Sequence, residues 1–150
     1  MIRRAHAGDL ESLMALERRC FAPHEGLFQR RQIKHLLTSA KAAWFVYGEY
    51  WGACCMLISA NGRARWGRLY SLAVDPAHRQ HGIGRALVLA GLQWLTVQHI
   101  DQCRAEVKAG NESARRLYES LGFAQTAELP HYYGIGGHGL RLTKALRDAP

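Results

Sequence analysis

The segment from Arg79 to Arg85 carries the residues best suited to hold an anionic ligand. A strand pattern ends at Val74, and Gly82 and Gly84 then open a long apolar helix. Glycines let the backbone approach a ligand closely, while the first N–H groups of a helix and its dipole favour negative charge. Arg79 and Arg85 add positive charge beside them. We therefore predict a phosphate-bearing ligand at this loop, and a diphosphate fits it best.

Two common nucleotide motifs are missing from the same segment. A kinase-type phosphate loop needs Gly-Lys followed by Ser or Thr, which occurs nowhere in the chain. A dinucleotide fingerprint needs a third small residue where Leu87 stands, and its glycines should follow the strand directly. Both readings are therefore excluded. The two glycines alone would equally suit close helix packing.

Two blocks together resemble a known family. Residues 79–84, Arg-Gln-His-Gly-Ile-Gly, follow Leu-Ala-Val-Asp-Pro and are similar to the R/Q-x-x-G-x-G/A signature of the GCN5-related N-acetyltransferase (GNAT) superfamily. Residues 111–123 are similar to the N-x-x-A-x-x-L-Y-x-x-x-G-F block of the same family. The blocks stand in the family's order, and the resemblance extends over nearly the whole chain.

The resemblance implies an enzyme that moves the acetyl group of acetyl-CoA directly to a primary amine. In that family the loop holds the pyrophosphate, and the preceding strand bonds the pantetheine arm through its main chain. Asn111 would bond the pantetheine or a water, or cap its helix. The residues expected to bind acetyl-CoA are Leu72, Ala73, Val74, Arg79, Gln80, His81, Gly82, Ile83, Gly84, Arg85 and Asn111. No metal is expected, because the histidines lack metal-ligand spacing.

Acetyl transfer needs a base for the ammonium, donors that polarise the thioester carbonyl, and an acid for the leaving thiolate. Tyr118 matches the family's thiolate-facing tyrosine, and a phenol with an ordinary pKa near 10 can protonate a thiolate. We predict it to be the general acid. Spacing alone would equally make it a core tyrosine beside Leu117 and Leu121.

Glu106 is the predicted general base, acting directly or through a water. It lies in the short strand pattern before Asn111, between apolar neighbours. Here the chain looks most similar to the bacterial ribosomal-protein alanine N-acetyltransferases, whose Leu-Glu-Val-Arg strand places the base at the matching glutamate. The alternative is a glutamate held only for structural hydrogen bonds.

Tyr132 and Tyr133 are the predicted acceptor-binding residues, because a tyrosine pair in the same subfamily helps wall the slot for a peptide N-terminus. They are otherwise exposed aromatics, and the glycine-rich segment that follows departs from the subfamily. A protein or peptide N-terminus is the expected acceptor. A small-molecule amine (polyamine, amino sugar or antibiotic) and a catalytically silent CoA-binding module remain alternatives. The acceptor, the acyl preference beyond acetyl, and the choice between monomer and homodimer stay open.

Positioning these residues requires an α/β fold. Apolar periodicity and turn signals predict strands and helices in alternation. The resemblance implies one GNAT domain over residues 1–150, with a mixed, mostly antiparallel sheet of about six to seven strands and about four helices. We expect strands at 2–6, 44–47, 51–59, 66–74, 103–107, 123–129 and 139–146, and helices from Asp9 (as N-cap) to Glu17, over 28–37, 82–98 and 111–121. Pro23 and Gly26 should end the first helix. In the third, Leu89 and Val97 should flank the apolar stripe.

Composition limits the partners. The chain has 150 residues and a formal net charge of +8, which suits an anionic cofactor. The basic residues are scattered without a basic tail, which disfavours nucleic acid. No apolar run reaches the roughly 20 residues of a membrane span, and no signal core follows the N-terminus, so we expect a cytoplasmic protein. The four cysteines lack a disulfide or metal pattern, and Cys54 and Cys55 should point to opposite faces of a strand.

Overall fold

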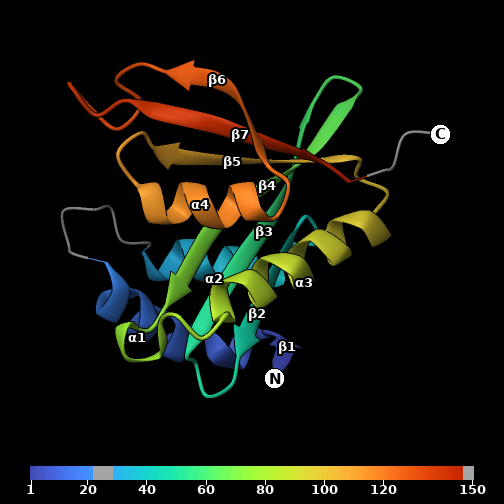
Figure 1. The fold of residues 1–150 in the computed structure, drawn as a ribbon. Coiled ribbons are helices and arrows are strands. Elements are labelled where there is room, and N and C mark those ends of the chain that lie inside the picture. Colours follow the sequence, from blue (N-terminus) through green and yellow to red (C-terminus); the bar gives the residue numbers. More distant parts are fainter. Residues whose placement is uncertain (22–28, 147–150) are drawn as a thin grey trace.

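The computed structural model describes residues 1–21 and 29–146. Its strands form one seven-stranded sheet in the order β1-β2-β3-β4-β5-β7-β6, in which β4 and β5 are parallel and the other neighbours antiparallel (Figure 1). The strands are β1 Ile2–Arg4, β2 Ala42–Tyr47, β3 Gly52–Asn61, β4 Ala64–Val74, β5 Gln102–Lys108, β6 Ala124–Leu129 and β7 Gly139–Ala145. The predicted mixed, mostly antiparallel sheet is confirmed.

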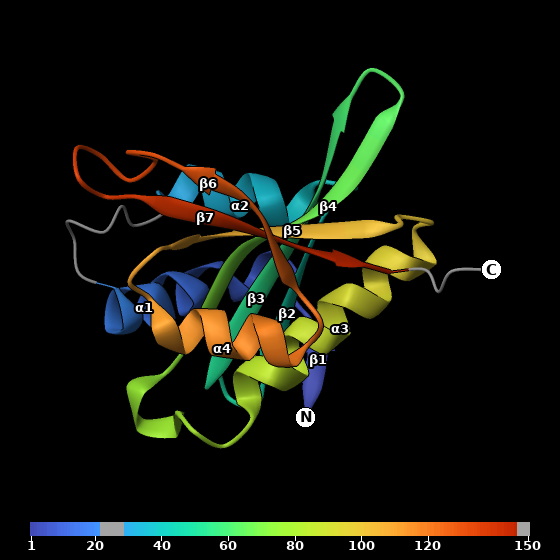
Figure 2. The same ribbon diagram turned by 45° about the horizontal axis from the view of Figure 1, so that its top comes forward.

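Four α-helices cover the two faces of the sheet in the described part of the chain. They are α1 Leu10–Cys20, α2 Arg30–Thr38, α3 Ile83–Val97 and α4 Glu112–Ser120. Helices α1 and α2 lie on one face, and α3 and α4 on the other (Figures 1 and 2). Each face has its own apolar core. Adjacent Cys54 and Cys55 enter different cores, as their alternation on a strand predicts.

Helix α3 packs very close to the sheet because glycines stand at the contacts. A Cβ on Gly67 of β4 would collide with Leu95, and a Cβ on Gly91 of α3 would collide with Met56. Both contact side chains are fully buried. At the other end of α3, a Cβ on Gly52 would collide with Ile83 and Leu87, and Gly52 pairs with Val74. This contact holds the start of α3, and with it the predicted phosphate loop, against the end of β4.

Strand β4 has two irregularities that open the sheet. Its register with β3 changes by one residue, since Met56 pairs with Leu69 but Cys55 pairs with Ser71. Its parallel pairing with β5 is confined to Gly67 and Arg68. Beyond that point β5 turns away from β4, as Figures 1 and 2 show. The edge of β4 leading to Val74 therefore borders a gap in the sheet.

Two local expectations need correction, and a third lies outside the described residues. The Asp9 side chain does not cap α1; it accepts hydrogen bonds from the His6 backbone N–H at 2.8 Å and from Arg3 at 2.7 and 2.9 Å. Leu89 and Val97 are 47% and 60% exposed, because the buried face of α3 is rotated away from them. The predicted break at Pro23 and Gly26 lies outside the described residues, as does Phe28. Within the described chain, no helix has both the length and the apolar character to cross a membrane.

Candidate functional site

A groove of about 580 Å³ lies between the end of β4, the start of α3 and the start of α4. It contains every residue predicted to bind the cofactor except Ala73 and His81, and also the predicted acid Tyr118. The lining residues are Leu72, Val74, Arg79, Gln80, Gly82, Ile83, Gly84, Arg85, Asn111, Ser113, Ala114, Leu117 and Tyr118. The fold thus brings two blocks that are distant in sequence to one surface.

The loop before α3 has an unusual backbone. Gln80 and Gly82 both have left-handed φ angles, of 65° and 75°, and α3 begins at Ile83. His81 between them does not have a left-handed φ angle. When left-handed residues alternate with others in this way, successive backbone N–H groups point toward one side and form a concave anion site. A Cβ on Gly82 would meet no atom within 4 Å, so the space beside it is open. The His81 side chain is exposed and does not line the groove.

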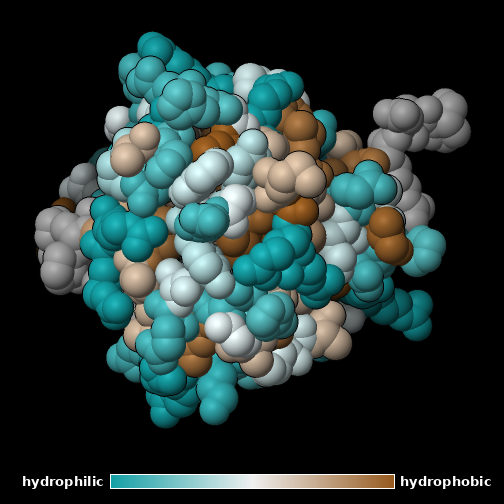
Figure 3. Space-filling view, turned by 90° about the horizontal axis from the view of Figure 1, so that it is seen from below, coloured by the Kyte–Doolittle hydropathy of each residue, from teal (hydrophilic) through white to brown (hydrophobic). Residues whose placement is uncertain are grey.

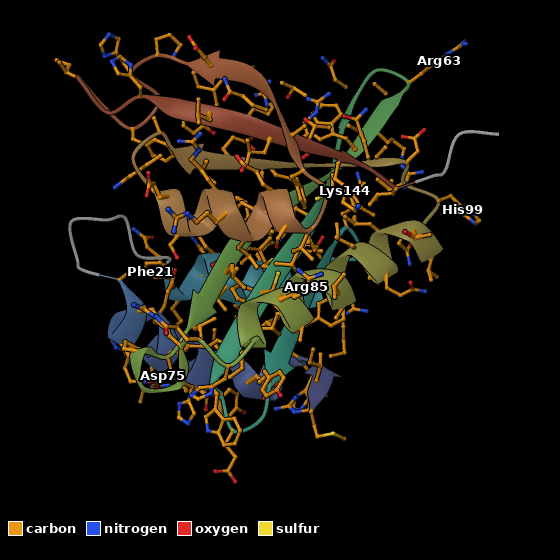
Figure 4. All side chains as sticks on the ribbon, viewed as in Figure 1. Phe21, Arg63, Asp75, Arg85, His99 and Lys144 are labelled. Carbon is orange, nitrogen blue, oxygen red and sulfur yellow. The ribbon has the colours of Figure 1, made fainter. Side chains whose placement is uncertain are left out.

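Both predicted arginines are held at the rim of the groove. The Nε of Arg79 donates to the Val74 carbonyl at 3.0 Å, and the Nη1 of Arg85 donates to Ser120 Oγ of α4 at 3.1 Å. Figure 4 shows Arg85 at the start of α3, facing α4. These bonds leave other N–H groups of each guanidinium for an anion. Seen from the side of this loop, the surface shows hydrophobic side chains as separate spots among hydrophilic ones (Figure 3).

The register change in β4 decides which strand residues reach the groove. Leu69 lies in the core beneath α3 and α4. Tyr70 is the extra residue of β4, and because of it Leu72 and Val74 lie on the same face as Leu69. Ala73 consequently points into the opposite core, beneath α1 and α2. The prediction that Ala73 contacts a ligand therefore fits only its main chain.

Tyr118 reaches the groove from α4. It is 6% exposed, and its ring packs against Phe123 with centroids 5.6 Å apart. Burial raises its pKa well above the ordinary value, and the nearby Cys54, Cys103 and Tyr133 add to that rise. The phenol therefore keeps its proton at neutral pH. Tyr118 is therefore both a core side chain and a groove residue, while its role as general acid stays a prediction.

Asn111 also has two roles in one place. Its Oδ1 accepts a hydrogen bond from the backbone N–H of Ala114 at 3.1 Å, which caps α4. The same residue lines the groove. The alternatives left open by the sequence are therefore compatible.

Glu106 lies on the other face of β5, where it forms a cluster with residues of β4 and of the β6–β7 connection. Its Oε1 lies 3.3 Å from Arg68 Nε, and its Oε2 is buried without a hydrogen-bond partner among the described residues. Arg68 also donates to the Tyr132 hydroxyl at 3.2 Å. Burial raises the pKa of Tyr133 to about 12, with Tyr132 and Glu106 adding to the effect.

The cluster and the groove meet at the gap between β4 and β5. Tyr133 contributes to the raised pKa of Tyr118, and Glu106 contributes to the raised pKa of Tyr133. The fold therefore gathers the predicted acid, the predicted base and the tyrosine pair around one opening.

Arg68 is the site residue that the sequence did not single out. Its only signal was its place on a strand, two residues before Tyr70, over whose ring its guanidinium lies at 5.5 Å. Pairing of β4 with β5, which brings Arg68 to Glu106, is not visible in either segment alone. Among residues 1–21 and 29–146, no three His, Cys, Asp or Glu side chains form a group suited to a metal ion.

Comparison with known proteins agrees with this geometry. The model of the acetyltransferase (GNAT) family matches residues 10–123. A mycothiol acetyltransferase from Thermobispora bispora is 36% identical over 130 residues, which are 78% of this chain and 43% of that protein. N-alpha-acetyltransferase 30 from Homo sapiens is 37% identical over 93 residues, 62% of this chain and 26% of that protein. The chain thus spans less than half the length of these curated relatives.

Solved structures share the fold. The ribosomal-protein-S18-alanine N-acetyltransferase from Escherichia coli superposes with a TM-score of 0.82 at 22% identity, covering 100% of this chain and 96% of that one. NAA60 from Arabidopsis thaliana in complex with acetyl-CoA gives a TM-score of 0.82 at 17% identity, covering 97% of both chains. The family model matches residues 10–123, which are most of this chain, and the fold has the loop, the groove and the opening in the sheet. This chain therefore belongs to the acetyltransferase (GNAT) family.

Proposed function

We propose that this protein is an N-acetyltransferase that uses acetyl-CoA and a primary amine as its substrates. The observation that carries the proposal is the groove. Its lining includes the start of α3, which is suited to an anion, the open edge of β4, and the protonated phenol of Tyr118. A Cβ on Gly84 would come within 3.5 to 3.7 Å of Leu117, Val74 and Leu72 and so fill part of the space. The residues present therefore fit a long, phosphate-bearing thioester.

Each part of acetyl-CoA has a proposed partner. The N–H groups at the start of α3, from Gly82 to Arg85, would hold the pyrophosphate, with Arg79 and Arg85 adding charge. The edge of β4 at Leu72 to Val74 would bond the pantetheine arm through its main chain. Asn111 would bond the same arm or a water. Acetyl-CoA supplies the activated acetyl group, and the protein orients it toward the gap between β4 and β5.

Proton transfer would use the two faces of that gap. Glu106 takes a proton from the incoming ammonium, directly or through a water, at its unpartnered Oε2. The free amine attacks the thioester carbonyl, so that a C–N bond forms and the C–S bond breaks. Tyr118, which stays protonated at neutral pH because burial raises its pKa, gives its proton to the leaving thiolate. The attacking nitrogen loses its second proton as the amide forms, and this proton returns to Tyr118, directly or through a water.

The acceptor that we favour is a protein or peptide N-terminus. Tyr132 and Tyr133 stand beside Glu106 on the face opposite the groove, where they can wall an extended chain. The relatives named N-alpha-acetyltransferase 30 support this acceptor. A small-molecule amine is the second candidate, because the relative matched over the larger share of this chain is named mycothiol acetyltransferase.

The cofactor assignment is tested with a pair of matched glycine variants. Gly82 and Gly62 both have left-handed φ angles, 75° and 63°, and open space for a Cβ, but Gly62 lies in the β3–β4 turn away from the groove. We expect acetyl-CoA at 100 times its Kd to stabilise the wild type and Gly62→Asp by about 2.7 kcal/mol, a rise in Tm of about 5–10 °C. Gly82→Asp should lose this rise, since its carboxylate would repel the pyrophosphate. An unchanged Tm of the wild type would contradict acetyl-CoA binding.

A further inference from the structure

Within residues 1–21 and 29–146, the face of the sheet around Glu106 is basic and has no helix core packed on it. On β5, Cys103, Ala105 and Val107 enter the core beneath α3 and α4, so Arg104, Glu106 and Lys108 face the other way. The core beneath α1 and α2 is built, in the described part of the chain, from β2, β3, β4 and the segment after β1, and contains no residue of β5, β6 or β7. Those two helices therefore do not extend over this half of the sheet.

Positive charge dominates that face. We define the acceptor face as Arg68, Arg104, Glu106, Lys108 and Arg141. Arg141 lies directly across from Glu106 in the antiparallel register of β5 and β7, and its Nε is buried without a hydrogen-bond partner among the described residues. Within the same residues, the one ion pair of this face joins Arg68 to Glu106. Four cations thus share one carboxylate.

The cations flank the proposed base at distances that suit a peptide. Arg104 and Lys108 stand two residues before and after Glu106, which places each about 7 Å along the strand. An extended peptide whose amine is at Glu106 has its second and third side chains about 3–7 Å further on. Carboxylates at those positions would therefore come beside the cations of the acceptor face.

We propose that the acceptor of the acetyl group is a peptide or protein N-terminus with Asp or Glu among its first residues after the amine. This inference rests on the proposed acetyl transfer and adds the chemistry of its acceptor. The proposal also explains why a single carboxylate, Glu106, stands among four cations. Glu106 receives the ammonium of the peptide, while the cations bind its acidic side chains.

The aromatic residues of the face favour a peptide over nucleic acid. Arg104 lies over the Trp66 ring at 4.3 Å, Arg68 over Tyr70 at 5.5 Å and Lys108 over Tyr133 at 5.8 Å. Bases bind single-strand sites by stacking on open aromatic faces. Here each of these rings already has a cation over one face, so the site offers charge rather than stacking.

The test measures thiol release from acetyl-CoA with three matched peptides that begin Ala-Glu-Glu, Ala-Gln-Gln and Ala-Lys-Lys. We expect kcat/KM for the acidic peptide to exceed that for the amide peptide by about tenfold at low salt, and the ratio to fall toward one as salt screens the charges. Lys108→Glu should lower the ratio and raise turnover of the lysine peptide. Lys41→Glu, an equal charge change at an exposed residue before β2, should leave all three values unchanged.

The outcomes separate this inference from the proposed function. Equal turnover of the acidic and amide peptides by an active enzyme overturns the acidic acceptor but leaves acetyl transfer standing. Acetylation of free glutamate without that of any peptide also overturns the acidic peptide acceptor and leaves acetyl transfer standing. So does a Lys108→Glu variant that loses binding of a labelled oligonucleotide but keeps the peptide preference. Absence of thiol release with every amine, despite a Tm shift by acetyl-CoA, contradicts the proposed function itself and the acceptor with it.

Discussion

Tyr118 and Glu106 come from different elements, α4 and β5, and from opposite faces of the sheet. Tyr118 is a buried phenol on α4, whereas Glu106 is a carboxylate paired with Arg68 on the far face. Their proposed roles can therefore be removed separately, and each removal should affect chemistry rather than cofactor binding.

We predict that Tyr118→Phe and Glu106→Gln each lower kcat by about 100-fold, the lower range for a general acid or base. Phenylalanine keeps the ring contact with Phe123, and glutamine keeps the size of the side chain, so the Tm rise with acetyl-CoA should persist. Thiol release at saturating acetyl-CoA measures the change. Tyr47→Phe on β2, which removes a hydroxyl away from the groove, should turn over like the wild type. An unchanged kcat would remove either residue from its proposed role.

At the level of single residues, local motifs predicted the groove but not its surroundings. The loop and the Asn111 block each carry their own signal, and the fold brings them together. Arg68 carried no such signal, because its position beside Glu106 depends on the pairing of two strands more than thirty residues apart in sequence. The orientation of Ala73 was equally hidden, since a single extra residue in β4 reverses the faces that follow it.

The elements themselves were easier to predict than their faces. Strand patterns and turn residues located the strands, and glycines and helical periodicity located the helices. Helix α3 shows where this fails. It is apolar on nearly every side, so periodicity does not distinguish its buried face, and Leu89 and Val97 are exposed instead of flanking the core. Close contact with Gly67, which a sequence pattern does not reveal, decides the rotation of α3.

The link between β1 and α1 depends on a buried carboxylate instead of an N-cap. Asp9 is 1% exposed and holds two N–H groups of Arg3, the His6 N–H and the Tyr50 hydroxyl. Its hydrogen bonds with Arg3 lower its pKa well below the ordinary range, against the effect of burial. The charged form is therefore part of the folded state, and the two elements depend on it.

We predict that Asp9→Asn lowers the free energy of unfolding by about 2 kcal/mol at pH 7, because it removes the charge from a buried carboxylate that accepts hydrogen bonds from Arg3, the His6 N–H and Tyr50. A lowered folded pKa stabilises the protein above the unfolded value near 3.9, and that stabilisation is lost as pH falls below it. The variant should thus differ less from the wild type at pH 3 than at pH 7 in urea unfolding. Glu11→Gln, which removes an exposed ion pair with Arg30, should cost less than 1 kcal/mol. Equal costs for the two variants would contradict this reading.

Taken as a whole, the molecule divides its sheet between two tasks. The half formed by β1 to β4 is covered on both faces and contains the fully buried Cys54 and Cys55. The half formed by β5, β7 and β6 is covered by the core beneath α3 and α4 on one face and carries the acceptor face on the other. The groove lies at the junction, so the apolar packing that fixes the sheet also fixes the distance between the two proposed substrates.

That packing predicts how stability responds to alkaline pH. Burial raises the pKa of the Cys103 thiol to about 12, and it also raises the pKa values of Cys54 and Cys55. In the unfolded chain each thiol ionises near 8.5. Above that pH the unfolded state binds fewer protons than the folded state, so stability is complete below about 8.5 and falls as pH rises toward the folded pKa.

We expect each buried thiol to lower the free energy of unfolding by about 1.4 kcal/mol per pH unit in this window. Urea unfolding between pH 8 and pH 10.5, under reducing conditions, measures the slope. Cys103→Ala leaves a small cavity whose cost does not depend on pH, so it should shift the curve and reduce its slope by the share of one thiol. Ser59→Ala, at a strand position outside both cores, should leave the slope unchanged. A flat profile in the wild type would contradict this prediction, because it would mean that these thiols ionise in the folded protein as readily as in the unfolded chain.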